Sequence, residues 1–293
     1  MTGLDQSLKK CVKTLMTKAT GDLIEALKGP FYLKRGPVET LDYGETIRYA
    51  DEKITLYPAD HILGAAQVLV ECADGLRIGY TGDFRMGETP ILNADVLIME
   101  ATYGSPACKR PFENSVRDRL VSIVEEGLKQ GTVYVFGYHG KLQEVMQILH
   151  DAEMDVPFAA PERIVEVSSV CQRHGMDFGE LLNCEEEETK ELLDSNSPCV
   201  AFYHMMSRSK ISSEGFRIMV SGWQFSSAVR QIANREYLVA LSDHSDFDGL
   251  MEYVRQSRPK LVVTDNYRES HAQTLAKEIQ KRLGIAAVAL PEY

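Results

Sequence analysis

Two histidines and two carboxylates have residue types and positions that suit metal-assisted hydrolysis. His61 and His244 stand toward opposite ends of the chain, and Asp83 and Glu100 stand between them. A neutral imidazole is a common zinc ligand, and a carboxylate can bind one cation or bridge two. Together the four residues predict a metallohydrolase site. Each of them alone also has a purely structural interpretation.

Asp83 and His61 both follow predicted strands. Asp83 comes after Thr81-Gly82, so its carboxylate stands in a tight loop at a strand end, where catalytic groups are common. The alternative is a turn aspartate that stabilises its own loop. For His61, the alternative is a histidine whose hydrogen bonds are satisfied inside the fold.

Glu100 and His244 are candidates for proton transfer. Glu100 ends an apolar run, and a carboxylate there is costly unless it is paired or hydrogen-bonded. His244 precedes a predicted helix that Ser245 or Asp246 can cap. A histidine with a carboxylate partner has a raised pKa, which suits a general acid. The alternative is a capping turn in which His244 has no chemical role.

The segment Gly137-Tyr138-His139-Gly140-Lys141 lies between a predicted strand and a predicted helix. Glycines there let the backbone approach a ligand, and Lys141 near the helix start could contact a phosphate. The spacing is not that of a nucleotide P-loop. An ordinary strand-to-helix turn is the alternative.

The elements that must position these residues follow from hydrophobic periodicity. The first part reads as short strands, of which residues 94–99 are apolar enough to be buried on both faces. Residues 109–222 then alternate strands and helices. The end of the chain returns to the pattern of the first part. We therefore expect an α/β protein in which a βα module, 109–222, is inserted into a domain made from residues 1–108 and 223–293. The expected strands are 46–49, 54–57, 67–72, 77–80, 94–99, 132–138, 199–203, 217–220, 237–241, 261–264 and 286–290, and the expected helices are 116–128, 142–149, 164–171, 185–193, 247–254 and 273–283.

Composition narrows the class of protein. The chain has 293 residues and a formal net charge of −11, which argues against a surface coated with positive charge for nonspecific binding of nucleic acid or membranes. Its six cysteines include no Cys-x-x-Cys pair, so a zinc ribbon is not expected. It contains no apolar run of membrane-spanning length and no signal-peptide pattern. We expect a cytoplasmic protein that does not bind membranes.

Six segments in order resemble the metallo-β-lactamase superfamily and, within it, the β-CASP nucleases, especially prokaryotic RNA-processing exonucleases. Any one of the segments is weak, but six in order are specific. They are Asp60–Gln67, Tyr80–Phe84, Asp95–Gly104, Gly140–Glu144, Ser221–Trp223 and Ser242–Phe247. The resemblance implies an αββα sandwich with an inserted β-CASP βα domain. It also implies hydrolysis of phosphodiester bonds, with RNA favoured over DNA as the partner, and it is compatible with a homodimer.

The resemblance also implies a role for each candidate residue. His61 matches a ligand of the first zinc, and Asp83 matches a carboxylate that bridges two zinc ions. Glu100 matches the acid that orients a later histidine. His244 matches that histidine, which donates a hydrogen bond or a proton to the phosphate or leaving group. Three further residues, Gly140, Lys141 and Ser221, match positions that line the cleft for the nucleic-acid backbone.

Two departures from the family pattern concern the metal ligands. The His-x-His-x-Asp-His cluster is absent; it would lie just before a segment like Met1–Asp5, so we expect the chain to begin just downstream of it. A Val-His-Gly motif near the end is replaced by Val262–Asn266, in which Asp265 could serve as an oxygen ligand. Because a stable zinc site needs three or four protein ligands, His61 and Asp83 alone would not bind zinc tightly.

Three functions remain open from the sequence. The first is a β-CASP nuclease, and the second is a non-catalytic relative that acts as a scaffold or regulatory subunit of an RNA-processing complex. Retention of Glu100 and His244, which serve catalysis, favours the first. The third is a small-molecule hydrolase, against which the inserted module argues, because it resembles a nucleic-acid clamp.

Overall fold

The computed structural model describes residue 8 and residues 13–211, 215–267 and 271–292. The chain divides into two compact units, unit 1 (residues 1–109 and 243–293) and unit 2 (residues 110–242). The segment Met1–Asp5, which we expected to follow the absent histidine cluster, lies outside the described residues. None of the described helices is long and apolar enough to cross a membrane.

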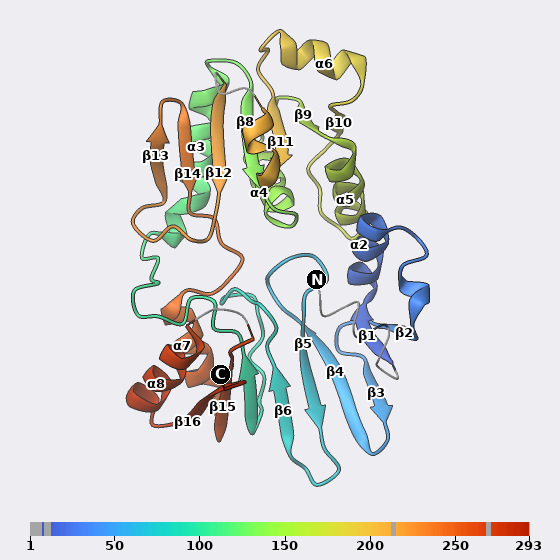
Figure 1. Ribbon diagram of the computed structural model, residues 1–293, viewed down its shortest axis with the longest axis vertical. Coiled ribbons are helices and arrows are strands. Elements are labelled where there is room, and N and C mark those ends of the chain that lie inside the picture. Colours follow the sequence, from blue (N-terminus) through green and yellow to red (C-terminus); the bar gives the residue numbers. More distant parts are fainter. Residues whose placement is uncertain (1–7, 9–12, 212–214, 268–270, 293) are drawn as a thin grey trace. The chain divides into compact units, whose positions relative to one another are not determined.

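Unit 1 contains a seven-stranded sheet, a two-stranded parallel sheet and three α-helices among its described residues (Figure 1). The elements are β1 (Thr14–Thr17), α2 (Lys18–Lys28), the short 3₁₀ helix η1 (Leu33–Arg35), β2 (Val38–Leu41), β3 (Thr46–Tyr49), β4 (Glu52–Pro58), β5 (Ala66–Glu71), β6 (Arg77–Tyr80), β7 (Val96–Met99), α7 (Phe247–Ser257), β15 (Leu261–Asp265), α8 (Ala272–Leu283) and β16 (Ala286–Leu290).

The large sheet of unit 1 joins both ends of the chain. Its strand order is β16-β15-β7-β6-β5-β4-β3, parallel from β16 to β6 and antiparallel from β6 to β3. The β5–β6 hairpin turns at Asp74-Gly75, where Gly75 has φ +89° and the Asp74 side chain accepts from Leu76 N at 2.9 Å. The pairing of β7 with β15 makes strands from the N-terminal and C-terminal segments neighbours in one sheet.

Helices α7 and α8 cover one face of this sheet and close the core of unit 1. Buried side chains of the two helices, including Leu250, Val254 and Leu275, pack against Leu97 and Val262 of the central strands. Apolar residues recur along both helices at helical spacing, which is the pattern that buries one face.

At β7, the opposite face of the sheet is only partly buried. Along β7, Leu97 and Met99 are fully buried, whereas Val96 and Ile98 are half-buried. The expectation that this strand is buried on both faces is therefore wrong. All four residues are apolar, so the sequence alone shows no alternation between the two faces.

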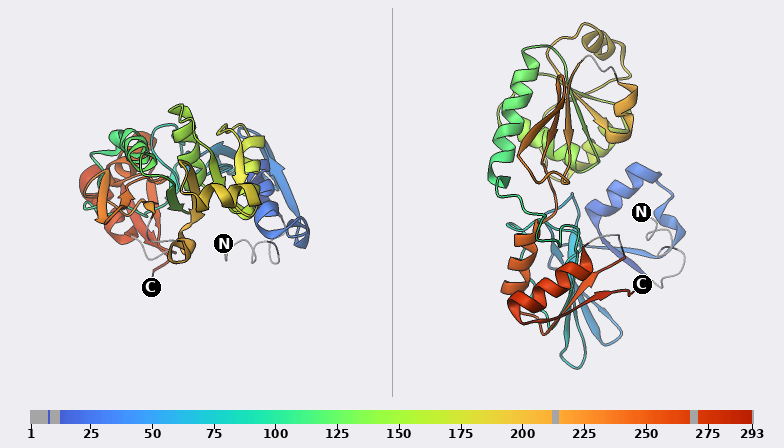
Figure 2. Two further views of the ribbon diagram at one scale, coloured as in Figure 1. Left: turned by 90° about the horizontal axis from the view of Figure 1, so that it is seen from above. Right: turned by 60° about the vertical axis from the view of Figure 1, so that its left-hand side comes forward.

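Unit 2 contains a second seven-stranded sheet with its own helices (Figure 2). The elements are η2 (Glu113–Ser115), α3 (Val116–Leu128), β8 (Val133–Gly137), α4 (Lys141–Asp151), β9 (Phe158–Ala160), α5 (Glu162–Arg173), β10 (Leu181–Asn183), α6 (Glu187–Asp194), β11 (Val200–His204), η3 (Met205–Lys210), β12 (Phe216–Val220), β13 (Val229–Ala233) and β14 (Glu236–Val239).

The strand order of unit 2 is β10-β9-β11-β8-β12-β14-β13, and only β13 runs antiparallel to its neighbour. Because β12 pairs with β14, the unit continues past residue 222, where the sequence analysis placed the end of the inserted module. The strand that we expected to belong with the C-terminal part, 237–241, corresponds to β14 and lies in this second sheet.

The central strands of unit 2 are buried on both faces. Every residue of β12 is buried, and β8 is buried except for the half-buried Tyr134. Helix α3 packs closely on one face, where a Cβ at Gly127 would lie 2.6 Å from Val133. On the other face, the Arg217 guanidinium lies 4.9 Å from the ring centre of Phe136. The structure thus confirms a mixed α/β protein.

Candidate metal centre

His61 is fixed by the connection between β4 and β5. The turn closes with Ala65 N donating to Ile62 O at 3.0 Å. The hydroxyls of Thr17 and Thr20, at the start of α2, both donate to Gly64 O at 2.9 Å. Gly64 has φ +81°, and a Cβ there would lie 2.6 Å from Thr20 Oγ1, so a glycine is required for this close contact. The turn that carries His61 is thereby tied to α2.

Asp83 follows β6 and is held in place by a neighbouring ion pair. Arg85 donates from Nε and Nη2 to the two carboxylate oxygens of Asp60, at 2.9 and 3.1 Å. Arg85 N also donates to Asp60 O at 2.6 Å. Because Asp60 precedes His61 and Arg85 follows Asp83 by two residues, this pair joins the two loops that present the candidate ligands.

Glu100 and His244 form a direct hydrogen-bonded pair. His244 Nδ1 lies 2.9 Å from Glu100 Oε2 and 3.1 Å from Oε1. Glu100 is 4% exposed, and its Oε1 also accepts from Phe84 N at 2.7 Å. Asp246 caps α7 by accepting from Gly249 N at 2.9 Å, as the sequence predicts. A carboxylate only accepts, so the proton of His244 lies on Nδ1 and leaves Nε2 on the other side of the ring.

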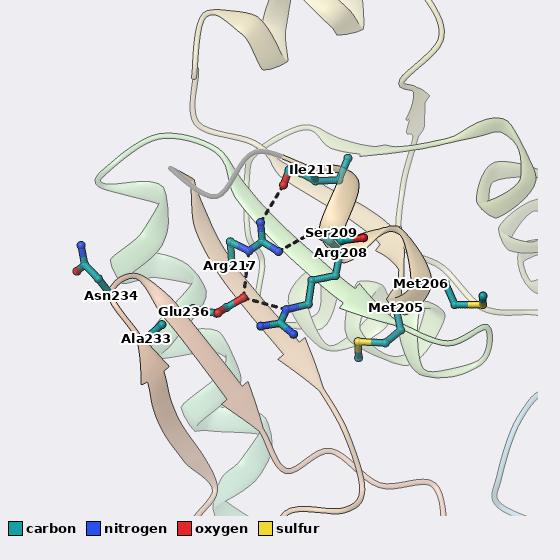
Figure 3. Close-up of a pocket in the computed structure, with 9 residues that line it drawn as sticks. All are labelled: Met205, Met206, Arg208, Ser209, Ile211, Arg217, Ala233, Asn234 and Glu236. Carbon is teal, nitrogen blue, oxygen red and sulfur yellow. Dashed lines mark hydrogen bonds and ion pairs between the residues drawn. The ribbon is translucent and has the colours of Figure 1, made fainter.

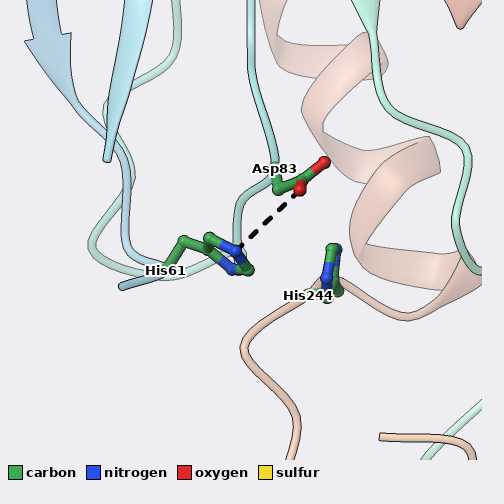
Figure 4. A group of neighbouring side chains, drawn as sticks. All are labelled: His61, Asp83 and His244. Carbon is green, nitrogen blue, oxygen red and sulfur yellow. Dashed lines mark ion pairs between the residues drawn. The ribbon is translucent and has the colours of Figure 1, made fainter. Parts of the chain in front are cut away.

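Three candidate side chains converge, as Figure 4 shows. One ligand atom from each of His61, Asp83 and His244 lies within 4.8 Å of the other two. His61 Nε2 is 3.9 Å from Asp83 Oδ2, and the two imidazole ring centres are 4.7 Å apart. The structure therefore brings together residues that are 183 positions apart in the sequence, His61 to His244.

Asp243 orients His61. His61 Nδ1 lies 2.8 Å from Asp243 O, and a carbonyl oxygen only accepts, so Nδ1 carries the proton and Nε2 is left toward Asp83. The Asp243 carboxylate is close to both rings, with Oδ2 3.6 Å from His61 Nδ1 and Oδ1 3.9 Å from His244 Nε2. Both imidazoles thus have an oxygen partner that fixes the tautomer, which is usual for metal-binding histidines.

The pKa of His244 is shifted by opposing effects. Burial lowers it, but the hydrogen bond and charge of Glu100 raise it, and so do the charges of Asp243 and Asp83. The net effect places the pKa of His244 above its ordinary value. In the absence of a metal, the three carboxylates therefore favour a protonated His244.

The donor types of this group fit a zinc ion. Two imidazole nitrogens and one carboxylate oxygen are the usual protein ligands of a catalytic zinc, which keeps a further position open. The converging group gives three candidate ligands among the described residues, one more than we expected from His61 and Asp83. The added ligand is His244, for which the sequence suggested only a role in proton donation.

The other predicted site residues are not among the three converging side chains. Asp265 ends β15 and accepts from Tyr267 N at 2.9 Å, and it is not among the three converging ligands. Gly140, Lys141 and Ser221 belong to unit 2. Gly140 precedes α4, Lys141 begins it, and Ser221 directly follows β12.

Sequence reasoning missed Asp243, Asp60 and Arg85 as supporting residues. Each is adjacent or nearly adjacent to one candidate but contacts a residue of another loop, and no spacing rule pairs residues across different loops. A carboxylate directly beside a candidate histidine, as at positions 60 and 243, was the available signal.

Two surface cavities have linings that include none of the three converging side chains. One, of about 730 Å³, borders Asp265 and is lined by Tyr80, Ile98, Val263, Tyr267, Leu290, Pro291 and Glu292. The other, of about 590 Å³ and drawn in Figure 3, lies in unit 2 beside η3. There Glu236 Oε1 accepts from Arg208 Nε at 3.0 Å and Arg217 Nε at 3.1 Å. Both guanidinium groups are thereby bound within the protein, which indicates that this cluster stabilises η3.

Comparison with known proteins gives several relatives. The chain is 44% identical over 138 residues to an uncharacterized protein in the lig 3′ region of Acidianus ambivalens, covering 46% of this chain and 99% of that protein. It is 27% identical over 320 residues to the transcription termination factor FttA of Pyrococcus abyssi, covering 85% of this chain and 49% of that protein. It is 38% identical over 125 residues to the endoribonuclease YSH1 of Eremothecium gossypii, covering 39% of this chain and 16% of that protein.

The chain thus spans about half or less of the length of the two relatives with named activities. It matches no protein-family model. Among solved structures, a protein of unknown function from Enterococcus faecalis V583 aligns with a TM-score of 0.68 at 16% identity, covering 96% of this chain and 74% of that one. This likeness shows the fold alone.

Proposed function

We propose that this chain, which belongs to one family with the uncharacterized protein of the lig 3′ region of Acidianus ambivalens, is a metal-dependent β-CASP nuclease that acts on RNA. The convergence of His61, Asp83 and His244 carries the proposal, because three possible ligand atoms within 4.8 Å of one another are a group that could hold a cation. The names of FttA and YSH1 support RNA as the substrate. The six-segment resemblance supports the β-CASP assignment, with unit 1 as the metallo-β-lactamase-like domain and unit 2 as the insert.

The chain's own residues would act as follows. Asp243 and the Asp60–Arg85 pair hold His61 and Asp83 in position. Glu100 holds His244 through its Nδ1. In its protonated form, His244 can donate from Nε2 to a phosphate oxygen or to the leaving group. A bound zinc ion would polarise the phosphodiester and lower the pKa of the attacking water.

His244 Nε2 cannot coordinate a cation and donate a proton at the same time. Its raised pKa favours donation, whereas its distance from the other two ligands allows coordination. Whether His244 Nε2 donates a proton or coordinates the metal therefore distinguishes an active nuclease from a relative that only binds metal. The cytoplasmic location, the second zinc ion and the homodimer stay predictions from the sequence.

Metal binding is tested by titrating the purified chain with zinc against a competing chelator. We expect one ion per chain, and we expect His61→Ala and Asp83→Ala to weaken binding at least tenfold. His150→Ala, a histidine in unit 2, is the matched control and should bind zinc as the parent does. Unchanged affinity in His61→Ala would overturn the metal centre.

Catalysis is tested on labelled single-stranded RNA and on DNA of the same sequence, with zinc and with chelator. We expect zinc-dependent cleavage of RNA, and a loss of about 10²–10⁴-fold in Glu100→Gln at a zinc concentration that saturates both proteins. Zinc binding without cleavage of either strand would leave the non-catalytic scaffold as the better description. Cleavage that survives the removal of zinc and the Asp83→Ala change would contradict the proposal outright.

A further inference from the structure

Aromatic side chains gather where three neighbouring strands of unit 2 end. His204 is the last residue of β11, Tyr138 directly follows β8, and Trp223 follows β12 by three positions. The three strands are parallel, and His204 pairs in register with Gly137. Their carboxyl ends therefore meet at one edge of the sheet, and the rings belong to that edge.

Two of these rings are exposed although they are large and apolar. Tyr138 is 55% exposed and Trp223 is 61% exposed. The Tyr138 ring is held edge-to-face by His204, with ring centres 5.1 Å apart at 84°. This contact restricts the Tyr138 side chain while leaving much of its surface open to solvent, so little ordering is needed when a flat ligand stacks on it.

The topology makes this edge a suitable ligand site. From β8 the chain crosses through α4 to β9 on one side of the sheet, whereas from β12 it continues to β13 and β14 on the other side. The chain therefore leaves the adjacent strands β8 and β12 in opposite directions along the sheet. In open α/β sheets, ligands bind outside the carboxyl ends of the strands at such a switch point. Tyr138 and Trp223 flank it.

Polar groups at the same edge suit a phosphate. Helix α4 begins at Lys141, after Gly140 with φ +90°, so the positive end of the helix lies next to Tyr138. His139 Nδ1 is buried and has no hydrogen-bond partner among the described residues. Its ring centre is 5.5 Å from that of His204, which adds a second imidazole to the edge. An unpaired buried nitrogen is costly unless a ligand or water satisfies it.

We infer that this edge of unit 2 binds single-stranded nucleic acid by stacking one base on Tyr138 and a second base on Trp223. The inference rests on the proposed function for its ligand class. Single strands are held by aromatic stacking together with positive groups along the backbone, and both are present here. Stacking tolerates every base because each has a flat π face, so binding should show little preference for sequence.

Trp223 provides a direct test, because it is the only tryptophan of the chain. The full chain is titrated in chelator with a short oligouridylate, and Trp223 fluorescence is followed. We expect quenching, and a much weaker effect from an abasic oligomer of equal length. Tyr138→Ala should weaken binding by about 5- to 150-fold, and Tyr138→Phe should bind as the parent does. Tyr49→Ala, an exposed tyrosine of unit 1, is the matched control and should leave the affinity unchanged.

Equal quenching by the abasic oligomer, or equal affinity of the parent and Tyr138→Ala, would overturn the stacking site. Equal binding of a duplex would overturn its preference for single strands. Because the titration is done without metal, it is independent of cleavage. Quenching that persists in a chain that cuts nothing would support the stacking site while the nuclease proposal fails, and cleavage without quenching would do the reverse.

Discussion

The two seven-stranded sheets differ in how adjacent residues along their strands are buried. In β12 of unit 2, Ile218 is 0% and Met219 is 7% exposed, although they point to opposite faces. In β15 of unit 1, Val262 is fully buried and Val263 is half-buried. Among the described residues, unit 2 therefore encloses β12 on both sides of its sheet, whereas unit 1 encloses β15 fully only on the side of α7 and α8.

The difference shows that a run of apolar residues does not indicate whether a strand is buried on one face or on both. Strands that are buried on both faces and strands that are buried on one face both consist largely of apolar residues. Ile98 and Val263, for example, are apolar although they lie on the half-buried face of the unit 1 sheet. His61 and Asp83 follow strands of unit 1, and His244 precedes its helix α7, so all three candidate ligands belong to unit 1. The comparison can be tested by substitutions that sample each face in turn.

The largest effect is expected in β12. Ile218→Ala and Met219→Ala should each destabilise unit 2 by about 2–5 kcal/mol, because each deletion leaves a cavity in a covered face. Urea unfolding followed by Trp223 fluorescence reports this unit, which contains the only tryptophan. A cost below about 1 kcal/mol for either variant would show that one face is not a packed core.

The next effect concerns the polar network beneath the covered face of unit 1. Tyr253 OH donates to Gln67 Oε1 at 2.6 Å and accepts from Leu92 N at 3.0 Å, all in buried positions. Tyr253→Phe should cost about 1–3 kcal/mol, because both partners lose a buried hydrogen bond. Hydrogen exchange in β5 and α7 measures the change. Tyr49→Phe, at an exposed position, is the control and should be neutral, and an equal effect of the two variants would contradict the network's importance.

A smaller difference is expected between the stability costs of matched substitutions at two neighbouring valines of β15. Val262→Ala should cost about 2 kcal/mol, because two methyl groups leave a fully buried site. Val263→Ala should cost less than about 1 kcal/mol, because the half-buried position already contacts solvent. Hydrogen exchange of the β15 and β16 amides measures both. Equal costs would mean that both faces of this sheet are enclosed.

The smallest effect is a pH dependence in unit 2. Burial lowers the pKa of His139 below its ordinary value of 6.5, and the nearby His204 and Arg163 lower it further. As pH falls through 6.5, the unfolded chain therefore takes up this proton before the folded unit does, so stability decreases. Urea unfolding should show a smaller loss of stability between about pH 7.5 and 5.5 in His139→Gln than in the parent. Identical pH dependence in the two proteins would show that His139 is not the group responsible.

Much of the fold follows from periodicity. The helical stripes at 116–128 and 247–254 and the hairpin around Asp74-Gly75 appear in the structure as α3, α7 and the β5–β6 turn. The assignment of β13 and β14 to the second sheet did not follow. Strand partners are chosen by packing and register across distant segments, and residues 229–239 contain no local signal that selects β12 as their neighbour.

The candidate site was predicted in part. The residue types and their loop positions identified His61, Asp83, Glu100 and His244, and the structure brings Glu100 and His244 into contact. The supporting contacts could not be foreseen. The Asp60–Arg85 pair and the carbonyl of Asp243 depend on where separate loops meet, which side-chain chemistry alone does not encode.

The sequence by itself determined the chemical repertoire of this protein: which strands carry an imidazole or a carboxylate at their ends, and which helices have an apolar face. Those properties are local, because they depend on residue type and on the repeat of a helix or strand. Only the tertiary structure decided that His244 converges with His61 and Asp83, and that β12 is enclosed on both faces while β15 is not. These outcomes depend on the pairing of β7 with β15 and of β12 with β14, which joins segments far apart in the chain.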